Sequence, residues 1–141
     1  MILSSAIAEL FMKNKIKKNL IIDAANEKII FKIIGKDKIY TNDYENSRKN
    51  FDKFAVLLFK FLKKNMISFK TLDKVLVNLG PGKYSSIRTS ITTLKALNLT
   101  YKFKIYGFSS KDVKNSDYSR VLYLLKKDKL IKNLIKPLYM S

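Results

Sequence analysis

The sequence predicts a single α/β domain in which helices cover a mixed β-sheet. Its 141 residues match the length of one domain, and a hydrophobic fraction of 47% is enough to form a core. The predicted elements follow the order β-β-β-α-β-α-β. A meander of strands followed by alternating helices and strands is typical of a mixed sheet with helices packed on it.

Three short strands open the domain. Residues 19–25 contain a continuous apolar run that reaches Asp23, as expected of a buried strand. Residues 27–34 and 37–41 are the next two strand-like runs, and the sequence GKD between them favours a hairpin turn. We therefore expect the domain to begin with an antiparallel meander.

The clearest helix is predicted over residues 46–65, with Asn46 or Ser47 as its cap. Its apolar side covers about half of the circumference, which is wider than the ~100° stripe needed to pack on one sheet. Two interpretations remain open: a deeply buried core helix, or a helix that packs on its own sheet and also on a partner protein. Under the second interpretation, the interface residues are Phe51, Phe54, Leu58, Phe59, Phe61 and Leu62.

A glycine-rich corner follows the next predicted strand, residues 72–79. Gly80 and Gly82 permit a sharp change of direction, and Pro81 fixes its shape. A helix is predicted from about Ser85 to Tyr101. Strand, glycine turn and helix in this order can form a phosphate cradle, or only a tight corner in a scaffold.

The helix after the corner carries a stripe of small residues opposite its apolar stripe. Small residues at helical spacing let another helix approach closely, although an ordinary exposed face of Ser and Thr has the same spacing. Lysine covers most other surfaces of this chain and is absent from this stripe. The residues that we assign to it are Ser85, Thr89, Thr92 and Ala96.

The last third of the chain is less clear. Residues 103–108 are predicted as a strand, and the polar stretch 109–117 as a loop or a short helix. For residues 119–125 we favour a strand over part of an amphipathic helix, and we leave the remainder open. The complete order resembles the ribonuclease-H-like lobe shared by the actin and sugar-kinase superfamily.

The absence of cysteine and histidine limits the chemistry that the chain can perform. It excludes disulfides, thiol nucleophiles, Ser-His-Asp triads and zinc sites built on Cys or His. Only eleven carboxylates remain, and they are scattered. We therefore predict no catalytic residue, no metal site and no independent enzyme.

The net charge of +18 would attract RNA, because lysines neutralise phosphates and release counterions. However, 26 of the 29 basic residues are Lys and only 3 are Arg. This ratio is also what a general compositional bias produces, whereas RNA contacts usually use more arginine. A basic module that binds tRNA or other RNA is therefore the alternative function, and weak attraction to RNA is expected in either case.

The corner carries a resemblance to a known family. NLGPGKYSSIRTSITTLKALNLTYKFKIYGFSS is similar to the bacterial TsaB (YeaZ) signature of Gly-Pro-Gly, Ser-Phe-Thr-Gly, a hydrophobic residue and Arg, a helix of small residues, and Gly-Val-Ser-Ser/Thr. LIIDAAN stands where the family has Ile-Asp-Thr-Ser and keeps Asp23, and the resemblance covers about residues 19–110 and the tail. The matching residues are Gly80, Pro81, Gly82, Tyr84, Ser85, Ile87, Arg88, Gly107 and Ser109, and in the tail Pro137, Leu138, Tyr139 and Met140.

The resemblance implies a role in making threonylcarbamoyladenosine on tRNAs that read ANN codons. TsaB proteins are non-catalytic scaffolds and activators that pair with the transferase TsaD through helices of the N-terminal lobe and work with the ATPase TsaE. The resemblance therefore implies a heterodimer with a TsaD-type partner, and a homodimer is an option for the isolated chain. It also implies that contact with tRNA is only indirect or weak. Arg88 could bond loop carbonyls or a partner carboxylate.

Several departures from the family bear on nucleotide binding. Ala24 and Ala25 replace the Thr-Ser that follows the aspartate, and Lys83 and Ser86 replace Ser and Gly in the loop. The second lobe is nearly absent, so no cleft between two lobes can form. We expect no cofactor to be bound by this chain alone. A nucleotide near Asp23 would be shared with the partner, and a residual ATPase or protease is disfavoured.

The domain is expected to span residues 18–141, as one TsaB-like lobe with a shortened tail. Residues 1–17 are expected to be a dispensable and disordered extension, and Met12 is an alternative start. The positive charges of this segment follow its apolar part, which is the wrong order for a secretory signal. With no apolar run of membrane-spanning length, we expect a cytoplasmic protein without a membrane partner.

Overall fold

The computed structural model describes residues 18–35, 37–133 and 135–138. The predicted extension, residues 1–17, lies outside the described residues. So do Tyr139 and Met140, which carry part of the predicted family likeness of the tail.

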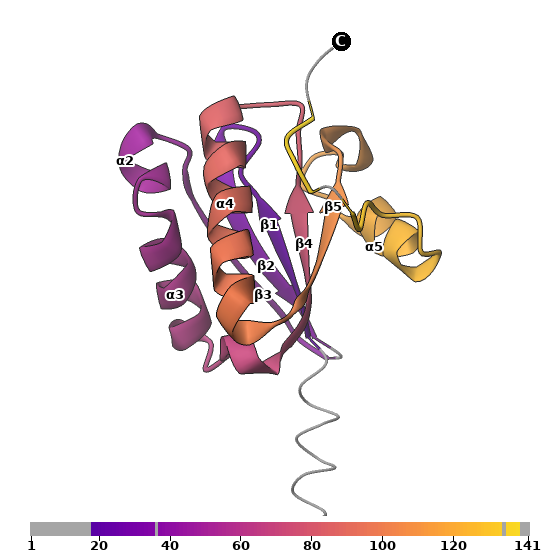
Figure 1. Cartoon of the computed structure of the whole chain (residues 1–141), viewed down its shortest axis with the longest axis horizontal. Helices are drawn as coiled ribbons and strands as arrows, with labels where there is room; N and C mark the ends of the chain where they lie inside the picture. Colours follow the sequence, from indigo (N-terminus) through magenta and orange to yellow (C-terminus); the bar gives the residue numbers. More distant parts are fainter. Residues whose placement is uncertain (1–17, 36, 134, 139–141) are drawn as a thin grey trace, which may run out of the picture.

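Five strands form one mixed sheet in the order β3-β2-β1-β4-β5 (Figure 1). The first two pairs, β1–β2 and β2–β3, are antiparallel, whereas β4 is parallel to both β1 and β5. The predicted meander and the predicted fold class, a single ribonuclease-H-like lobe, are therefore confirmed. The bounds of the strands are Lys18–Asp23 for β1, Lys28–Ile34 for β2, Ile39–Glu45 for β3, Leu72–Asn78 for β4 and Lys104–Phe108 for β5.

The register of the strands follows from which side chains can be buried. In β2, Ile29, Phe31 and Ile33 are fully buried and alternate with more exposed residues, because successive side chains of a strand point to opposite faces. The central strands β1 and β4 end in four consecutive buried residues each. Such runs are expected where both faces of a sheet are covered.

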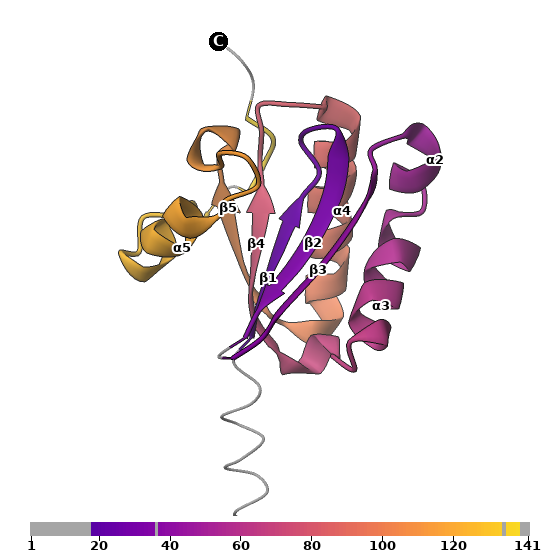
Figure 2. The ribbon, with the colours of Figure 1, turned by 180° about the vertical axis from the view of Figure 1, so that it is seen from behind.

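Three helices cover one face of the sheet: α2 (Arg48–Phe51), α3 (Phe54–Lys64) and α4 (Tyr84–Tyr101) (Figures 1 and 2). The single helix predicted over residues 46–65 is divided at Asp52 and Lys53. Lys53 has φ −104° and ψ 20°, which lies outside the α-helical region. The larger hydrophobic core lies between these helices and the sheet, with Phe31 in edge-to-face contact with Phe54.

The opposite face is covered by α5 (Ser119–Lys126), so the prediction of a strand over residues 119–125 is wrong. A short apolar run fits a strand and a helix equally well, and here packing decides. Val121 is fully buried in a second core cluster with Ile21, Leu76 and Phe108, whose side chains come from the sheet. Two short 3-10 helices, η1 (Phe69–Thr71) and η2 (Ser110–Asp112), complete the described elements.

The segment after α5 returns along β5. Ile131 and Gly107 form an antiparallel bridge, with the N–H of Gly107 donating to the Ile131 carbonyl at 2.7 Å. None of the helices in the described part of the chain is long and apolar enough to cross a membrane.

Candidate functional site at the glycine corner and the outer helix faces

The parallel strands β1, β4 and β5 all end at the same edge of the sheet, and their following loops meet there. Ligands of open α/β sheets bind at this kind of edge. Asp23 ends β1 and Asn78 ends β4, and the predicted Gly-Pro-Gly corner follows directly. This edge is therefore the first place to search for a site.

Asp23 lies at the centre of a closed hydrogen-bond network. It is only 2% exposed, and its Oδ1 accepts hydrogen bonds from Asn78 Nδ2 at 2.9 Å and the Ala25 N–H at 3.2 Å. Its Oδ2 accepts the Tyr118 hydroxyl at 2.9 Å. Burial, followed by the charge of Asp23 and the hydrogen bond to it, raises the pKa of Tyr118 above its ordinary value. The Tyr118 hydroxyl therefore stays protonated and donates.

The corner is attached to the neighbouring loops through its backbone. Asn78 Oδ1 accepts the Gly80 N–H at 2.8 Å, and the Ser110 N–H donates to the Gly80 carbonyl at 2.9 Å. Gly80 has a φ of +105°, which favours glycine. The Leu138 N–H donates to the Leu79 carbonyl at 2.7 Å, so the C-terminal segment lies against the corner.

The inner side of the corner is filled by the chain itself. The Lys83 N–H donates to the Ala25 carbonyl at 2.8 Å. A Cβ added to Gly82 would lie 2.3 Å from that same carbonyl oxygen. Both oxygens of Asp23 also accept hydrogen bonds from the chain, so contacts within the fold hold this corner in place.

Two polar residues that the sequence did not identify as site residues connect the corner to the rest of the edge. Ser86 is 1% exposed, and its hydroxyl donates to the Ala24 carbonyl at 2.7 Å. Asn46 is 7% exposed, and its Nδ2 lies 2.8 Å from the Ala24 carbonyl and 2.7 Å from the Asn26 carbonyl. Asn46 was expected only as a helix cap. Ser47 takes that role, by accepting the Asn50 N–H.

The outer end of the corner is open to solvent. Tyr84 is 44% exposed at the first position of α4. Arg88, one turn further, is also exposed and forms no ion pair with the described residues. Both residues lie at the end of the helix that the corner orients.

Helix α3 presents less apolar surface than the sequence suggested. Four of the six residues predicted for a partner interface are at most 2% exposed and pack in the chain's own core, so they have no surface to offer in this fold: Phe54, Leu58, Phe61 and Leu62. Phe51 is half-buried against the same core. Phe59, at 44% exposure, is the member of the set that faces outward, and Val56, which was not predicted, lies near it at 51%.

The small-residue stripe of α4 lies on the surface. Ser85, Thr92 and Ala96 are exposed, and Thr89 is half-buried with its hydroxyl donating to the Ser85 carbonyl at 2.8 Å. Leu99 lies on the same stripe and is 82% exposed, although the sequence analysis did not single it out. Helical spacing from Ser85 and Ala96 was the signal that could have identified it.

An aromatic groove lies beside the ends of α3 and α4. It encloses about 380 Å³, and Met66 at its rim is 94% exposed. The Phe69 ring lies 5.1 Å from that of Phe59 and 5.0 Å from that of Tyr101, measured between centroids. The outer faces of α3 and α4 therefore continue into an apolar depression.

Known proteins that resemble the chain were identified in sequence and in structure. No family model matches the chain. The tRNA threonylcarbamoyladenosine biosynthesis protein TsaB of Buchnera aphidicola subsp. Schizaphis graminum (strain Sg) is 29% identical over 94 residues, which are 67% of this chain and 45% of the relative.

In structure, YeaZ from Pseudomonas aeruginosa aligns with a TM-score of 0.60 at 14% identity, over 66% of this chain and 44% of YeaZ. An uncharacterized protein with similarity to peptidase YEAZ from Pseudomonas aeruginosa aligns with the same TM-score and identity, over 66% and 43%. The resemblance to the TsaB (YeaZ) family is thus confirmed in sequence, and the fold in structure. The chain spans about half the length of these relatives.

Proposed function

We propose that the chain is a non-catalytic accessory subunit in the biosynthesis of threonylcarbamoyladenosine on tRNA. The observation that carries the proposal is the sequence likeness to TsaB, which covers 67% of the chain. In this proposal the chain binds a TsaD-type transferase, in a complex that a TsaE-type ATPase also joins. The chemistry takes place on the partner.

The polar edge of the sheet supports an accessory role. A catalytic carboxylate must be within reach of a substrate, whereas Asp23 is only 2% exposed and both of its oxygens accept hydrogen bonds inside the fold. We propose that the chain alone binds no nucleotide, and that one at this edge would be held jointly with the partner.

The outer faces of α3 and α4 are the proposed contact surface for the transferase. The two helices lie side by side on one face of the sheet (Figures 1 and 2). Val56 and Phe59 from α3 and Leu99 from α4 are exposed apolar side chains, and the small residues Thr92 and Ala96 leave room for a helix of the partner. Aromatic and large apolar side chains are enriched in the cores of protein interfaces.

Replacing Phe59 with Glu tests this surface. The substitution puts a charge into the proposed interface at a side chain that is already 44% exposed. It also removes the edge-to-face contact with Phe69, so circular dichroism must first show that the variant is folded. We expect co-purification with the cognate TsaD-type protein to weaken by about 30-fold or more, as for a hot-spot residue. Tyr123→Glu, at 53% exposure on α5, is the matched control and should leave association unchanged.

The functional measurement is threonylcarbamoyladenosine in tRNA, quantified by mass spectrometry after reconstitution with and without the chain. Modification should require the wild-type chain and should fall with Phe59→Glu and not with Tyr123→Glu. If the chain does not co-purify with the transferase and its omission leaves modification unchanged, the proposal is refuted. Size-exclusion chromatography of the wild-type chain beside Phe59→Glu reports whether the chain alone forms a homodimer and whether this surface is needed for it.

A further inference from the structure

We propose that a trough between α4, β5 and the C-terminal segment binds the phosphate backbone of RNA. The choice of RNA over other polyanions rests on the proposed function, in which tRNA is the substrate of the complex. The site itself rests on the geometry and charge of the trough, which lies beside β5, at the opposite edge of the sheet from β3.

The trough encloses about 670 Å³. Lys95 from α4, Lys104 from β5 and Lys132 from the C-terminal segment line it, so three separate parts of the fold each contribute an ammonium group. Asn98 and Tyr106 add a polar and an aromatic side chain. The volume falls within the range of ligand pockets in proteins, about 300–1,000 Å³.

The positive charge of this region is only partly compensated. From Lys74 to Lys111 the sequence contains six lysines, one arginine and no Asp or Glu, although Lys74 pairs with Asp73 and Lys83 with Glu27. Lys95 and Lys104 form no ion pair within the described part of the chain, whereas Lys132 Nζ lies 2.6 Å from Asp128 Oδ1.

Carboxylates are placed at the other edge of the same sheet. Asp43 and Glu45 are exposed residues of β3, and Asp37 precedes that strand. A general lysine bias explains why lysines are numerous, but it does not explain why two of the three lysines in the trough have no carboxylate partner among the described residues. Segregated charge of this kind produces a local positive potential that attracts a polyanion.

The side chains of the trough suit a nucleic-acid backbone. Lysine ammonium groups donate hydrogen bonds to phosphate oxygens and displace its counterions. Asn98 Oδ1 is buried and has no hydrogen-bond partner among the described residues. After a small side-chain rotation, it could accept a hydrogen bond from a ribose 2′-hydroxyl, the group that distinguishes RNA from DNA.

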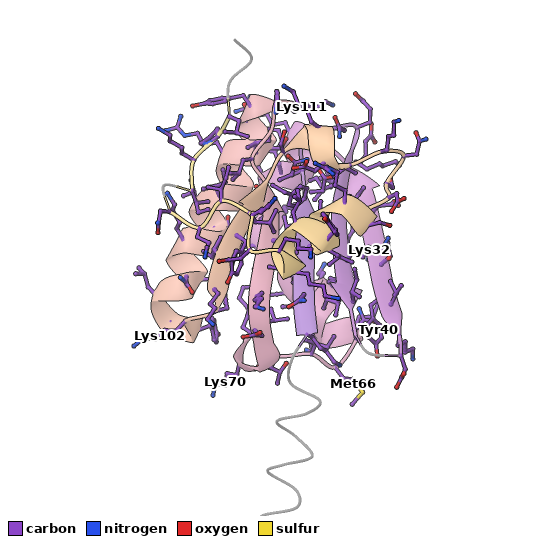
Figure 3. The ribbon with its side chains drawn as sticks, turned by 90° about the vertical axis from the view of Figure 1, so that its right-hand side faces the viewer. Lys32, Tyr40, Met66, Lys70, Lys102 and Lys111 are labelled. Atoms are coloured by element: carbon purple, nitrogen blue, oxygen red, sulfur yellow. The ribbon has the colours of Figure 1, made fainter. Side chains whose placement is uncertain are left out.

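Figure 3 labels two further lysines on this side of the molecule. Lys102 follows the end of α4, and Lys111 lies at the top of the same view. Lys102 and Lys111 are both exposed. A backbone that enters the trough could therefore meet further cations on leaving it.

The test measures binding of the full-length chain to a fluorescently labelled transcript of an ANN-decoding tRNA, by anisotropy over a range of salt concentrations. The variant Lys95→Gln/Lys104→Gln/Lys132→Gln should weaken binding at least about tenfold at low salt, and should lower the slope of log K against log salt by about two. The control removes the same charge from exposed positions on α2, on α3 and between them, namely Lys49→Gln/Lys53→Gln/Lys64→Gln. It should change binding less than about twofold.

A second variant is expected to increase the affinity for RNA, a change that misfolding would not produce. Asp128→Asn removes the carboxylate that pairs with Lys132. Asp128 has a φ of +57°, a conformation that Asn also tolerates, so the turn should be kept. We expect this variant to bind the tRNA transcript about two- to fivefold more tightly, because one more cation becomes available to phosphate.

Three outcomes would overturn the proposal. Equal weakening by the trough variant and the control would show that attraction is spread over the whole surface. Binding unaffected by Asp128→Asn would show that Lys132 takes no part. A DNA hairpin of equal length that binds as tightly, with the same dependence on the trough lysines, would reject RNA as the ligand. These measurements need no transferase. Failure of the chain to bind the TsaD-type protein can therefore be distinguished from failure of the trough to bind RNA.

Discussion

At the scale of single residues, the pair of Asp23 and Tyr118 shows how a residue expected near a nucleotide can become structural. Asp23 ends β1 at the edge where α/β proteins often bind ligands. Tyr118 lies 95 positions away in the sequence and covers it, with its hydroxyl 2.9 Å from Oδ2. The sequence showed the aspartate, but the residue that covers it could not be predicted, because the segment around Tyr118 was expected to form a different element.

Tyr118→Phe should therefore destabilise the fold. The substitution removes a donor from a buried carboxylate and keeps the ring, which packs edge-to-face on Phe108. Leaving a buried polar group without its partner costs about 1–3 kcal/mol. Urea denaturation at neutral pH, followed by far-UV circular dichroism, should show this loss in the free energy of unfolding. Tyr123→Phe, at an exposed tyrosine of α5, is the control and should be neutral.

The same pair predicts how stability depends on pH. The folded chain raises the pKa of Tyr118 above 10.0, so this group stabilises the fold fully below that pH and loses its contribution as the pH rises further. The unfolding free energy of the wild type then falls by at most about 1.4 kcal/mol per pH unit. Tyr118→Phe has no hydroxyl at this position, so its stability does not fall for this reason. The difference in unfolding free energy between wild type and variant should therefore shrink above about pH 10. A constant difference would contradict the proton-linked role of Tyr118.

At the scale of elements, the sequence predicts the strands well because their patterns are unambiguous. The continuous apolar run of β1 corresponds to a strand that is buried on both faces. The alternation of β2 corresponds to a strand that is buried on one face. The corner was also predictable, because two glycines and a proline follow β4 directly. The segment 119–125 was not, because the second face of the sheet that receives α5 exists only after the sheet has assembled.

The corner sets the position of α4, and Gly82→Ala tests this. Gly82 is exposed, yet an added Cβ would lie 2.3 Å from the Ala25 carbonyl oxygen, a backbone atom that cannot rotate away. Overpacking of this kind costs about 1–3 kcal/mol, and α4 should shift with it. We expect a lower urea midpoint and a weaker association with the TsaD-type partner. Lys126→Ala, at an exposed position of α5 on the opposite face of the sheet, should preserve both, and equal behaviour of the two variants would show that the corner tolerates displacement.

At the scale of the whole molecule, the C-terminal segment joins two cores that lie on opposite faces of the sheet. Leu130 belongs to the cluster beneath α5, and Ile135 belongs to the larger cluster beneath α3 and α4, so the chain passes around the β5 edge between them. On the way, Ile131 pairs with Gly107 and the Leu138 N–H reaches the Leu79 carbonyl. The sequence left this segment open, since its contacts with Gly107 and Leu79 join residues that are distant along the chain.

Deleting residues 129–141 should therefore destabilise the entire domain and not only its end. The deletion exposes the sites of Leu130 and Ile135, each 7% exposed in the intact chain, and opens the edge of β5. Burial of two such side chains contributes about 3–6 kcal/mol, which is comparable with the total stability of a small domain. Lys136→Ala, at an exposed residue of the same segment, is the control and should keep the urea midpoint of the intact chain. If the longer deletion also keeps that midpoint, the segment is only an appendage. If unfolding occurs in two separate transitions, the two cores are independent units, and the coupling that we infer across the sheet edge is absent.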